Sequence, residues 1–291
     1  MKTLAKTAVI FAVLVLCAVA FKIGYYEIGA SQRQSRVTAE YSAFVPSTVR
    51  KSQPQTLSQT EKPTELLTLA FPERIVIYSA EESTGTPVGS TTEKPDLSDS
   101  VFVGDSVSLG FSRYCAKQGI MKETVFLTAG SYAVHYALSK SMAADKGFKH
   151  PIYKGKETPL LKAVEEIKPK NVYFCLGIND ISGFGVEGTV KNYCKLINSV
   201  WGVDPNIHIY IVSTTFMVEQ AQKKNLNNLN LANLNHNMKL ICLEDERLDY
   251  IDIMSGLQNE KYALDGKYCS DGFIHQGNGA YEIWAERLGA K

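Results

Sequence analysis

The chain has 291 residues, of which 45% are hydrophobic and 21% are charged, a composition that is ordinary for a globular protein. Its formal net charge is +1, so neither a basic field for nucleic acid nor a solvating acidic tail is indicated. We therefore expect no nucleic-acid partner, and function has to be inferred from individual sites.

The N-terminus has the pattern of an export signal. Two lysines precede an uncharged, apolar run over residues 7–21. A positive segment before a short apolar core is typical of exported proteins. A small-x-small motif fits cleavage after Ala20 and a secreted product, whereas residues 1–30 as a whole fit an uncleaved membrane anchor. Both alternatives stay open, and we favour a membrane-anchored protein that faces outside.

Residues 31–97 differ in texture from the remainder of the chain. They are rich in Ser, Thr, Gln, Pro and Glu, a composition that cannot bury enough apolar surface to offset the entropy of ordering. Two apolar islands, residues 66–70 and 75–78, fit a short strand against the folded part. We interpret 31–97 as a low-complexity tether and 98–291 as the folded domain.

From residue 98 onward, strand-like and helix-like segments alternate. Short apolar runs predict strands, and stretches of helical spacing between them predict helices. The predicted strands are 101–103, 125–127, 172–175, 207–212 and 250–253, and the predicted helices are 107–118, 158–167, 188–200, 222–244 and 279–289. This alternation predicts an α/β fold: a three-layer α/β/α sandwich around a five-stranded parallel sheet.

Two segments and the cysteines invite other interpretations. We expect residues 225–237, rich in Asn and Leu, to form an amphipathic helix with its amides outward, a sugar-binding amide face being the alternative.

The glycine-rich residues 183–188 fit a mobile rim of a site. Five cysteines beyond residue 30, without paired spacing, indicate neither a disulfide framework nor a zinc site, although one disulfide remains open.

Small or polar residues follow the ends of the predicted strands. Ser106 ends the tripeptide GDS and follows the first strand, where a helix begins. Gly130 and Asn179 follow the second and third strands, and His275 precedes the last helix. In a parallel sheet these strand ends share one edge, so the side chains are expected to meet there. Helix capping by Asp105 or Ser106 is the plainer interpretation of GDS alone.

The four pieces, in this order, resemble the sequence blocks of the SGNH (GDSL-like) hydrolase family, over roughly residues 101–288. The resemblance implies that Ser106 is a nucleophile and that His275 is its base. It also implies an oxyanion hole made by the backbone amides of Ser106 and Gly130 and the side-chain amide of Asn179.

The acid of the site departs from the family's pattern. In the family the acid precedes the histidine by three residues, whereas Asp271 precedes His275 by four. Asp271 is our choice, with Asp265 as a fallback and a Ser–His dyad as the alternative. We expect Asp105 and Asp180 to brace loops by hydrogen bonding. The other histidines are interpreted as structural or surface residues: His135, His150, His208 and His236.

The resemblance implies a serine carboxylic-ester hydrolase that acts through a Ser106 acyl-enzyme without a cofactor or metal. We expect small acyl esters, with a lean towards O-acetyl groups on cell-wall or other polysaccharide, and a monomeric catalytic domain. An O-acyltransferase that uses the same serine, or an inactive glycan-binding module, are the alternatives. A phosphatase with Asp105 as nucleophile would need a magnesium-binding carboxylate pair that the sequence does not supply.

Overall fold

The computed structural model describes Leu69, Pro72 and residues 75–79, 89–92, 95–141 and 148–290. The predicted signal or anchor, residues 1–30, lies outside this part of the chain, as does most of the predicted tether. Among the residues described, no helix is both long and apolar enough to cross a membrane.

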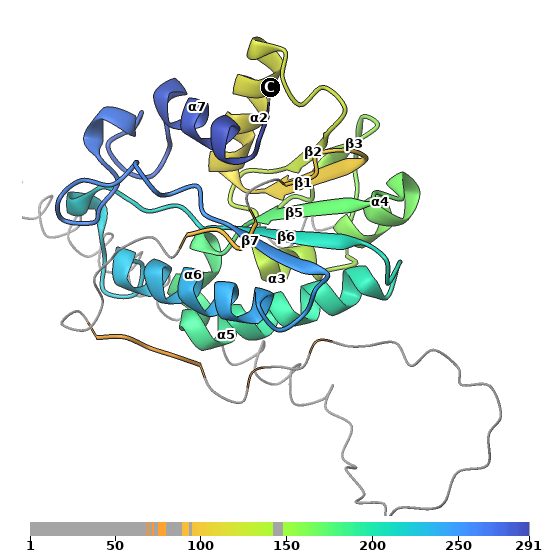
Figure 1. Ribbon diagram of the computed structural model, residues 1–291, viewed down its shortest axis with the longest axis horizontal. Helices are drawn as coiled ribbons and strands as arrows, with labels where there is room; N and C mark the ends of the chain where they lie inside the picture. Colours follow the sequence, from red (N-terminus) through yellow and green to blue (C-terminus); the bar gives the residue numbers. More distant parts are fainter. Residues whose placement is uncertain are drawn as a thin grey trace, which may run out of the picture. The chain divides into compact units, whose positions relative to one another are not determined.

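A five-stranded parallel sheet forms the centre of the domain, in the order β2-β1-β5-β6-β7 (Figure 1). The strands are β1 (Ser100–Gly104), β2 (Val125–Thr128), β5 (Asn171–Cys175), β6 (His208–Val212) and β7 (Leu248–Ile251). β1 and β5 are buried along their whole length, as expected for central strands covered on both faces. All five predicted strands are present.

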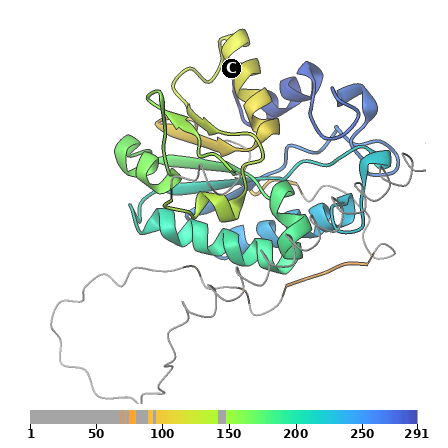
Figure 2. The ribbon, with the colours of Figure 1, turned by 180° about the vertical axis from the view of Figure 1, so that it is seen from behind.

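Helices cover both faces of the sheet, and the predicted three-layer α/β/α sandwich is confirmed. α2 and α7 lie on one face, and α3, α5 and α6 lie on the other (Figures 1 and 2). The helices are α2 (Ser106–Gln118), α3 (Val134–Ala137), α4 (Leu160–Ile167), α5 (Ile178–Trp201), α6 (Asn228–Cys242) and α7 (Asn278–Arg287). The short elements are β3 (Ile152–Tyr153), β4 (Lys156–Glu157), η1 (Glu219–Ala221) and η2 (Gly266–Tyr268).

The strand order creates a switch point at β1. The chain runs from β1 to the edge strand β2 and then returns to β5 on the other side of β1. Connections that leave a strand in opposite directions open a crevice at the carboxyl end of the sheet. The residues that directly follow β1, β2 and β5 therefore line one crevice.

Helix α5 begins ten residues earlier than predicted. The glycine-rich residues 183–188, interpreted as a mobile rim, are helical except at Gly185, where φ is 63° and ψ is −173°. Ile178, Ile181 and Val186 are all buried and carry the apolar stripe of the helix through this segment. Helical geometry is therefore interrupted at Gly185, and α5 consists of two helical parts on either side of this kink.

The asparagines of α6 do not face outward, contrary to our expectation. Asn233, Asn235 and Asn237 are buried, and each side-chain amide binds both the N–H and the C=O of one other residue. An asparagine amide carries one acceptor and two donors, so it can pair with a peptide group as a neighbouring strand would. These amides are occupied by the protein itself, which also removes the sugar-binding alternative for this face.

Two of these pairs hold residues that precede the sheet. Asn237 binds the N–H of Val76 at 2.9 Å and its C=O at 2.7 Å, and Asn233 binds Tyr78 at 2.9 and 3.1 Å. Asn198 of α5 binds Leu69 in the same way, at 2.8 and 3.0 Å. Leu69, Val76 and Tyr78 of the predicted tether are thus bound to α5 and α6.

Ser90 and Thr91, which also precede the sheet, form hydrogen bonds with residues in and just after the outer strand β7. Thr91 donates its N–H to the C=O of Tyr250, and the N–H of Tyr250 donates to Oγ1 of Thr91. Ser90 accepts a hydrogen bond from the N–H of Asp252. These bonds pair backbone groups that an edge strand would otherwise expose.

We expect a chain that begins at residue 98 to be less stable than one that begins at Thr64, by about 2–4 kcal/mol of unfolding free energy. The hydrogen bonds that tie the upstream residues to the domain are each worth ~1 kcal/mol net, and the entropy of ordering offsets part of the sum. Urea unfolding of both proteins measures the difference. Equal midpoints would show that the upstream residues add nothing.

The cysteines are free thiols where the structure describes them, from Cys115 to Cys269. Cys175 is buried in β5 and packs as a small apolar residue, as predicted. Burial raises the pKa of the Cys194 thiol to about 11, which keeps this group protonated and unreactive at neutral pH.

Candidate active site

Ser106, His275 and Asp271 form a continuous hydrogen-bonded line. Ser106 Oγ lies 2.9 Å from Nε2 of His275, and Nδ1 of the same ring lies 2.5 Å from Oδ2 of Asp271. Ser106 is the first residue of α2, directly after β1, whereas His275 comes from the loop before α7. Residues 169 positions apart are therefore placed as a nucleophile and its base require.

The four-residue spacing between Asp271 and His275 is absorbed by a tight turn. Oδ1 of Asp271 accepts the N–H groups of Phe273, Ile274 and His275 at 2.8, 3.0 and 3.1 Å. Gly272 has a φ of 69°, a left-handed conformation that glycine adopts without strain. The turn leaves Oδ2 facing the imidazole, so Asp271 reaches His275 despite the extra residue. Asp265, the fallback, instead caps η2.

Electrostatics fix the protonation of this pair. Desolvation is the largest effect on Asp271 and opposes ionisation, but hydrogen bonds from the His275 ring and from neighbouring N–H groups prevail and lower its pKa to about 2. An ionised carboxylate only accepts hydrogen bonds, so Nδ1 of His275 carries the proton. Nε2 then has its lone pair directed at the Ser106 hydroxyl, which is the arrangement for proton abstraction.

The backbone amide of Ser106 is left free by the way α2 is capped. Oδ1 of the N-cap residue Asp105 accepts the N–H groups of Val107 at 2.9 Å and Ser108 at 3.5 Å. The N–H of Ser106 has no acceptor among residues 95–141 and 148–290. A free amide at a helix N-terminus attracts negative charge.

Gly130 places a second free amide on the same edge. It follows β2 and is exposed, and its N–H likewise has no acceptor among the residues that the structure describes. A Cβ built at Gly130 would meet no atom within 4 Å, so open space lies beside this backbone. A substrate carbonyl has room to approach Gly130.

The Asn179 side chain lies in the same crevice with its amide already bonded. Nδ2 donates to the C=O of Tyr132 at 3.1 Å and to Oδ2 of Asp105 at 3.3 Å. The second bond is long, so it is the one that an incoming oxyanion would displace. The structure thus brings Asn179 to the site. To donate to the oxyanion, Asn179 must exchange its hydrogen bond to Asp105 for one to the substrate.

Two buried aspartates brace the loops of the site, as predicted. Asp105 is the N-cap of α2 and also accepts from Asn179. Asp180 accepts the N–H groups of Val134 and His135 and contacts Nδ1 of His135 at 2.7 Å, which joins α3 to the first turn of α5. Both carboxylates act on backbone and neighbouring side chains.

Asp105 makes stability depend on pH. Burial raises its pKa to about 6, against the lowering effect of the Val107 and Ser108 amides. The folded state therefore binds this proton more tightly than the unfolded chain, whose ordinary value is 3.8. The favourable contribution is present below pH ~4 and is lost as pH rises to about 6, on the order of 2–3 kcal/mol.

Asp105→Asn should remove that dependence while keeping a residue that caps helices well. We expect the stability of the wild type relative to the variant to decline between pH 4 and pH 7, measured as urea unfolding free energies at four pH values. Parallel curves for the two proteins would contradict the raised pKa.

The other four histidines are held elsewhere, as predicted. His150 is buried beside Tyr132, which contacts its Nδ1 at 3.1 Å, and burial lowers its pKa. The remaining three each contact one side chain at hydrogen-bonding distance, namely His135 with Asp180, His208 with Asp249 and His236 with Tyr78. Among the residues that the structure describes, no group of three or more His, Cys, Asp or Glu side chains is placed to hold a metal ion.

No protein-family model and no curated protein matches this sequence. The chain is similar in structure to a GDSL-like lipase from Bacteroides thetaiotaomicron, at 15% identity and a TM-score of 0.44, over 68% of this chain and 89% of that one. It is also similar to a carbohydrate esterase family 3 protein from Talaromyces cellulolyticus, at 12% identity and a TM-score of 0.44, over 65% and 94%.

A third similar structure is the periplasmic domain of a lipopolysaccharide acetyltransferase from Salmonella ser. Paratyphi A, at 12% identity and a TM-score of 0.43, over 68% and 84% of the two chains. The likeness in each case is distant. In this chain, a serine, a histidine and an aspartate meet at the carboxyl edge of a parallel sheet.

Proposed function

We propose that this protein is a serine carboxylic-ester hydrolase that works through an acyl-enzyme on Ser106. The observation that carries the proposal is the hydrogen-bonded line from Ser106 through His275 to Asp271, with two free backbone amides beside it. A serine hydroxyl is a poor nucleophile without a base that takes its proton, and this geometry supplies one.

The reaction follows from these contacts. Ser106 Oγ attacks the ester carbonyl while its proton moves to Nε2 of His275. The amides of Ser106 and Gly130, and Asn179 after it releases Asp105, receive the negative charge on the carbonyl oxygen. Nε2 then gives the proton to the departing alcohol, which leaves an ester on Ser106. Water, deprotonated by the same imidazole, hydrolyses that ester and restores the serine.

The proposal is tested by intact-mass analysis of the full-length protein after treatment with a serine-directed fluorophosphonate. We expect one covalent adduct in the wild type and none in Ser106→Ala, together with loss of p-nitrophenyl acetate turnover. Ser199→Ala is a matched control, because Ser199 lies near the end of α5, away from the site, and donates its hydroxyl to the C=O of Lys195. A folded protein with neither adduct nor turnover would refute the hydrolase.

We propose from the sequence that the natural substrate is an O-acylated polysaccharide and that the protein acts outside the membrane. Hydrolysis and acyl transfer share the same acyl-enzyme and differ only in whether water or a sugar hydroxyl accepts the acyl group. Analysis of the products in the presence of a sugar acceptor separates them. Release of free acid alone supports the hydrolase, and an acylated sugar would favour the transferase.

A further inference from the structure

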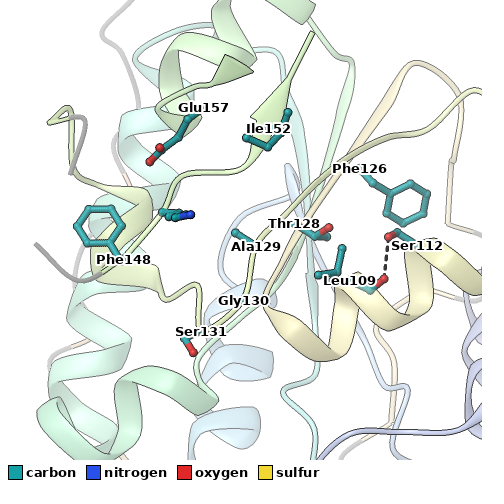
Figure 3. A pocket seen from close by; sticks show the side chains of 11 residues that line it. Leu109, Ser112, Phe126, Thr128, Ala129, Gly130, Ser131, Phe148, Ile152 and Glu157 are labelled. Carbon is teal, nitrogen blue, oxygen red and sulfur yellow. Dashed lines mark hydrogen bonds between the residues drawn. The ribbon is translucent and has the colours of Figure 1, made fainter. Parts of the chain in front are cut away.

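A pocket of about 900 Å³ lies beside the edge strand β2 (Figure 3). We call it the β2 pocket. Its wall comes from α2, β2, the loop after β2 and the β3–β4 hairpin, and its lining residues are Leu109, Ser112, Phe126, Thr128, Ala129, Gly130, Ser131, Phe148, Lys149, Ile152 and Glu157. The proposed mechanism makes no use of most of these residues.

Large hydrophobic side chains form much of the pocket lining. Leu109, Phe126, Phe148 and Ile152 contribute large hydrophobic groups from four different segments. The ring of Phe126 packs against the core rings of Phe102 and Phe111, with ring centroids 5.6 and 6.2 Å apart. Ile152 is 60% exposed, one of the most exposed large apolar residues in the part of the chain that the structure describes. Exposed apolar groups around a hollow mark a binding surface.

The β2 pocket adjoins the candidate active site at Gly130. Gly130, one of the two free amides, lines it, and Leu109 lies one helical turn after the nucleophile on α2. The space next to Gly130 is open to a distance of 4 Å from a Cβ built there. An ester whose carbonyl oxygen faces the Ser106 and Gly130 amides therefore has one substituent directed towards the pocket.

The position of the base decides which substituent that is. Phe273, in the His275 loop, is bonded through its C=O to the N–H of Val218, which follows β6. β6 and β2 lie on opposite sides of β1 in the sheet, and no residue of the His275 loop lines the pocket, so we infer that the base approaches Ser106 from the side away from it. The leaving oxygen must lie beside Nε2 of His275 to be protonated. The acyl group, on the other side of the carbonyl carbon, then faces the β2 pocket.

We propose that the β2 pocket is an acyl subsite that takes an alkyl chain longer than the methyl group of acetate. This inference rests on the proposed function and changes its expected substrate class, because an acetyl group would leave nearly all of the pocket unfilled. Each methylene that the pocket buries raises kcat/KM by roughly three- to fourfold.

The test compares two isomeric esters with the full-length protein: ethyl octanoate, with the long chain on the acyl side, and octyl acetate, with it on the alcohol side. Because the two esters are isomers of equal overall hydrophobicity, non-specific adsorption cannot explain a difference between their rates. We expect kcat/KM to be at least about tenfold higher for ethyl octanoate. Equal rates, or a preference for octyl acetate, would overturn the acyl subsite while leaving the hydrolase in place.

The variant Ile152→Ser tests whether the preference for a long acyl chain arises in the β2 pocket. We expect it to lower the ratio of the two kcat/KM values by about threefold or more, because it removes apolar contact with the acyl chain alone. Ile77→Ser is the matched control, since Ile77 is 56% exposed but lies on the upstream segment, outside the pocket lining. A ratio that Ile152→Ser leaves unchanged would exclude this pocket. Absence of turnover with every ester would instead overturn the proposed function itself.

Discussion

Asp271→Asn should lower kcat by about 10⁴-fold while the protein remains folded. The asparagine Oδ1 can still accept the N–H groups of Phe273, Ile274 and His275, so the turn survives. Its Nδ2, however, would donate to Nδ1 of the ring and place the imidazole proton on Nε2. Nε2 would then face the Ser106 hydroxyl as a donor and could not take its proton.

The measurement is kcat for p-nitrophenyl acetate, with the urea midpoint recorded for each protein. Asp265→Asn is the matched control: Asp265 caps η2 in the same connection between β7 and α7 and is bonded to Lys267. It should retain near wild-type kcat. A loss below about tenfold for Asp271→Asn would mean that Ser106 and His275 act as a dyad and that the 2.5 Å contact only orders the loop.

The fold could be predicted from the sequence because its signals are local. Apolar runs such as 172–175 and the helical stretches between them give the α/β alternation, and parallel pairing follows from it. The order of strands in the sheet did not follow from the pattern. That order decides which strand ends are neighbours, and it placed Ser106 between Gly130 and Asn179.

The wrong predictions concern α6 and the start of α5, where long-range contacts of side chains decide the local structure. The asparagines of α6 look like a solvated face because their bonds go to peptide groups as far as 161 positions away. Nothing in residues 225–237 indicates those partners. The glycine-rich start of α5 looks like a loop because glycine disfavours helices. Gly185 does interrupt the helix, but burial of Ile181 and Val186 accompanies helical structure on either side of it.

The candidate site shows the same division. The order of the four sequence pieces and their resemblance to the SGNH blocks led to the choice of Ser106, Gly130, Asn179 and His275. The reach of Asp271 depended on a turn that only the structure displays. The β2 pocket could not be predicted, because its lining residues come from segments that the sequence does not connect. Its lining residues form no sequence motif, and they come together only in the folded structure.

Asn179→Ala should lower kcat by about 10²–10³-fold with little change in KM, if its amide stabilises the oxyanion. The negative charge exists only after Ser106 attacks, so the interaction is made in the transition state and not with the bound ester. The competing interpretation is that Asn179 merely braces Tyr132 and Asp105, its two present partners. Loss of a brace would lower stability and would affect binding and turnover together.

An alkylboronic acid separates these interpretations, because it forms a tetrahedral anion on the serine. If Asn179 donates to the oxyanion, the loss of boronate affinity in Asn179→Ala should match the loss of kcat/KM, and the urea midpoint should change little. Asn192→Ala is the control, a buried asparagine on the same helix whose Nδ2 has no hydrogen-bond partner among the described residues. Unchanged boronate affinity in Asn179→Ala would leave only the two backbone amides as the oxyanion hole, and the 3.3 Å bond to Asp105 would then be the resting and working position of this side chain.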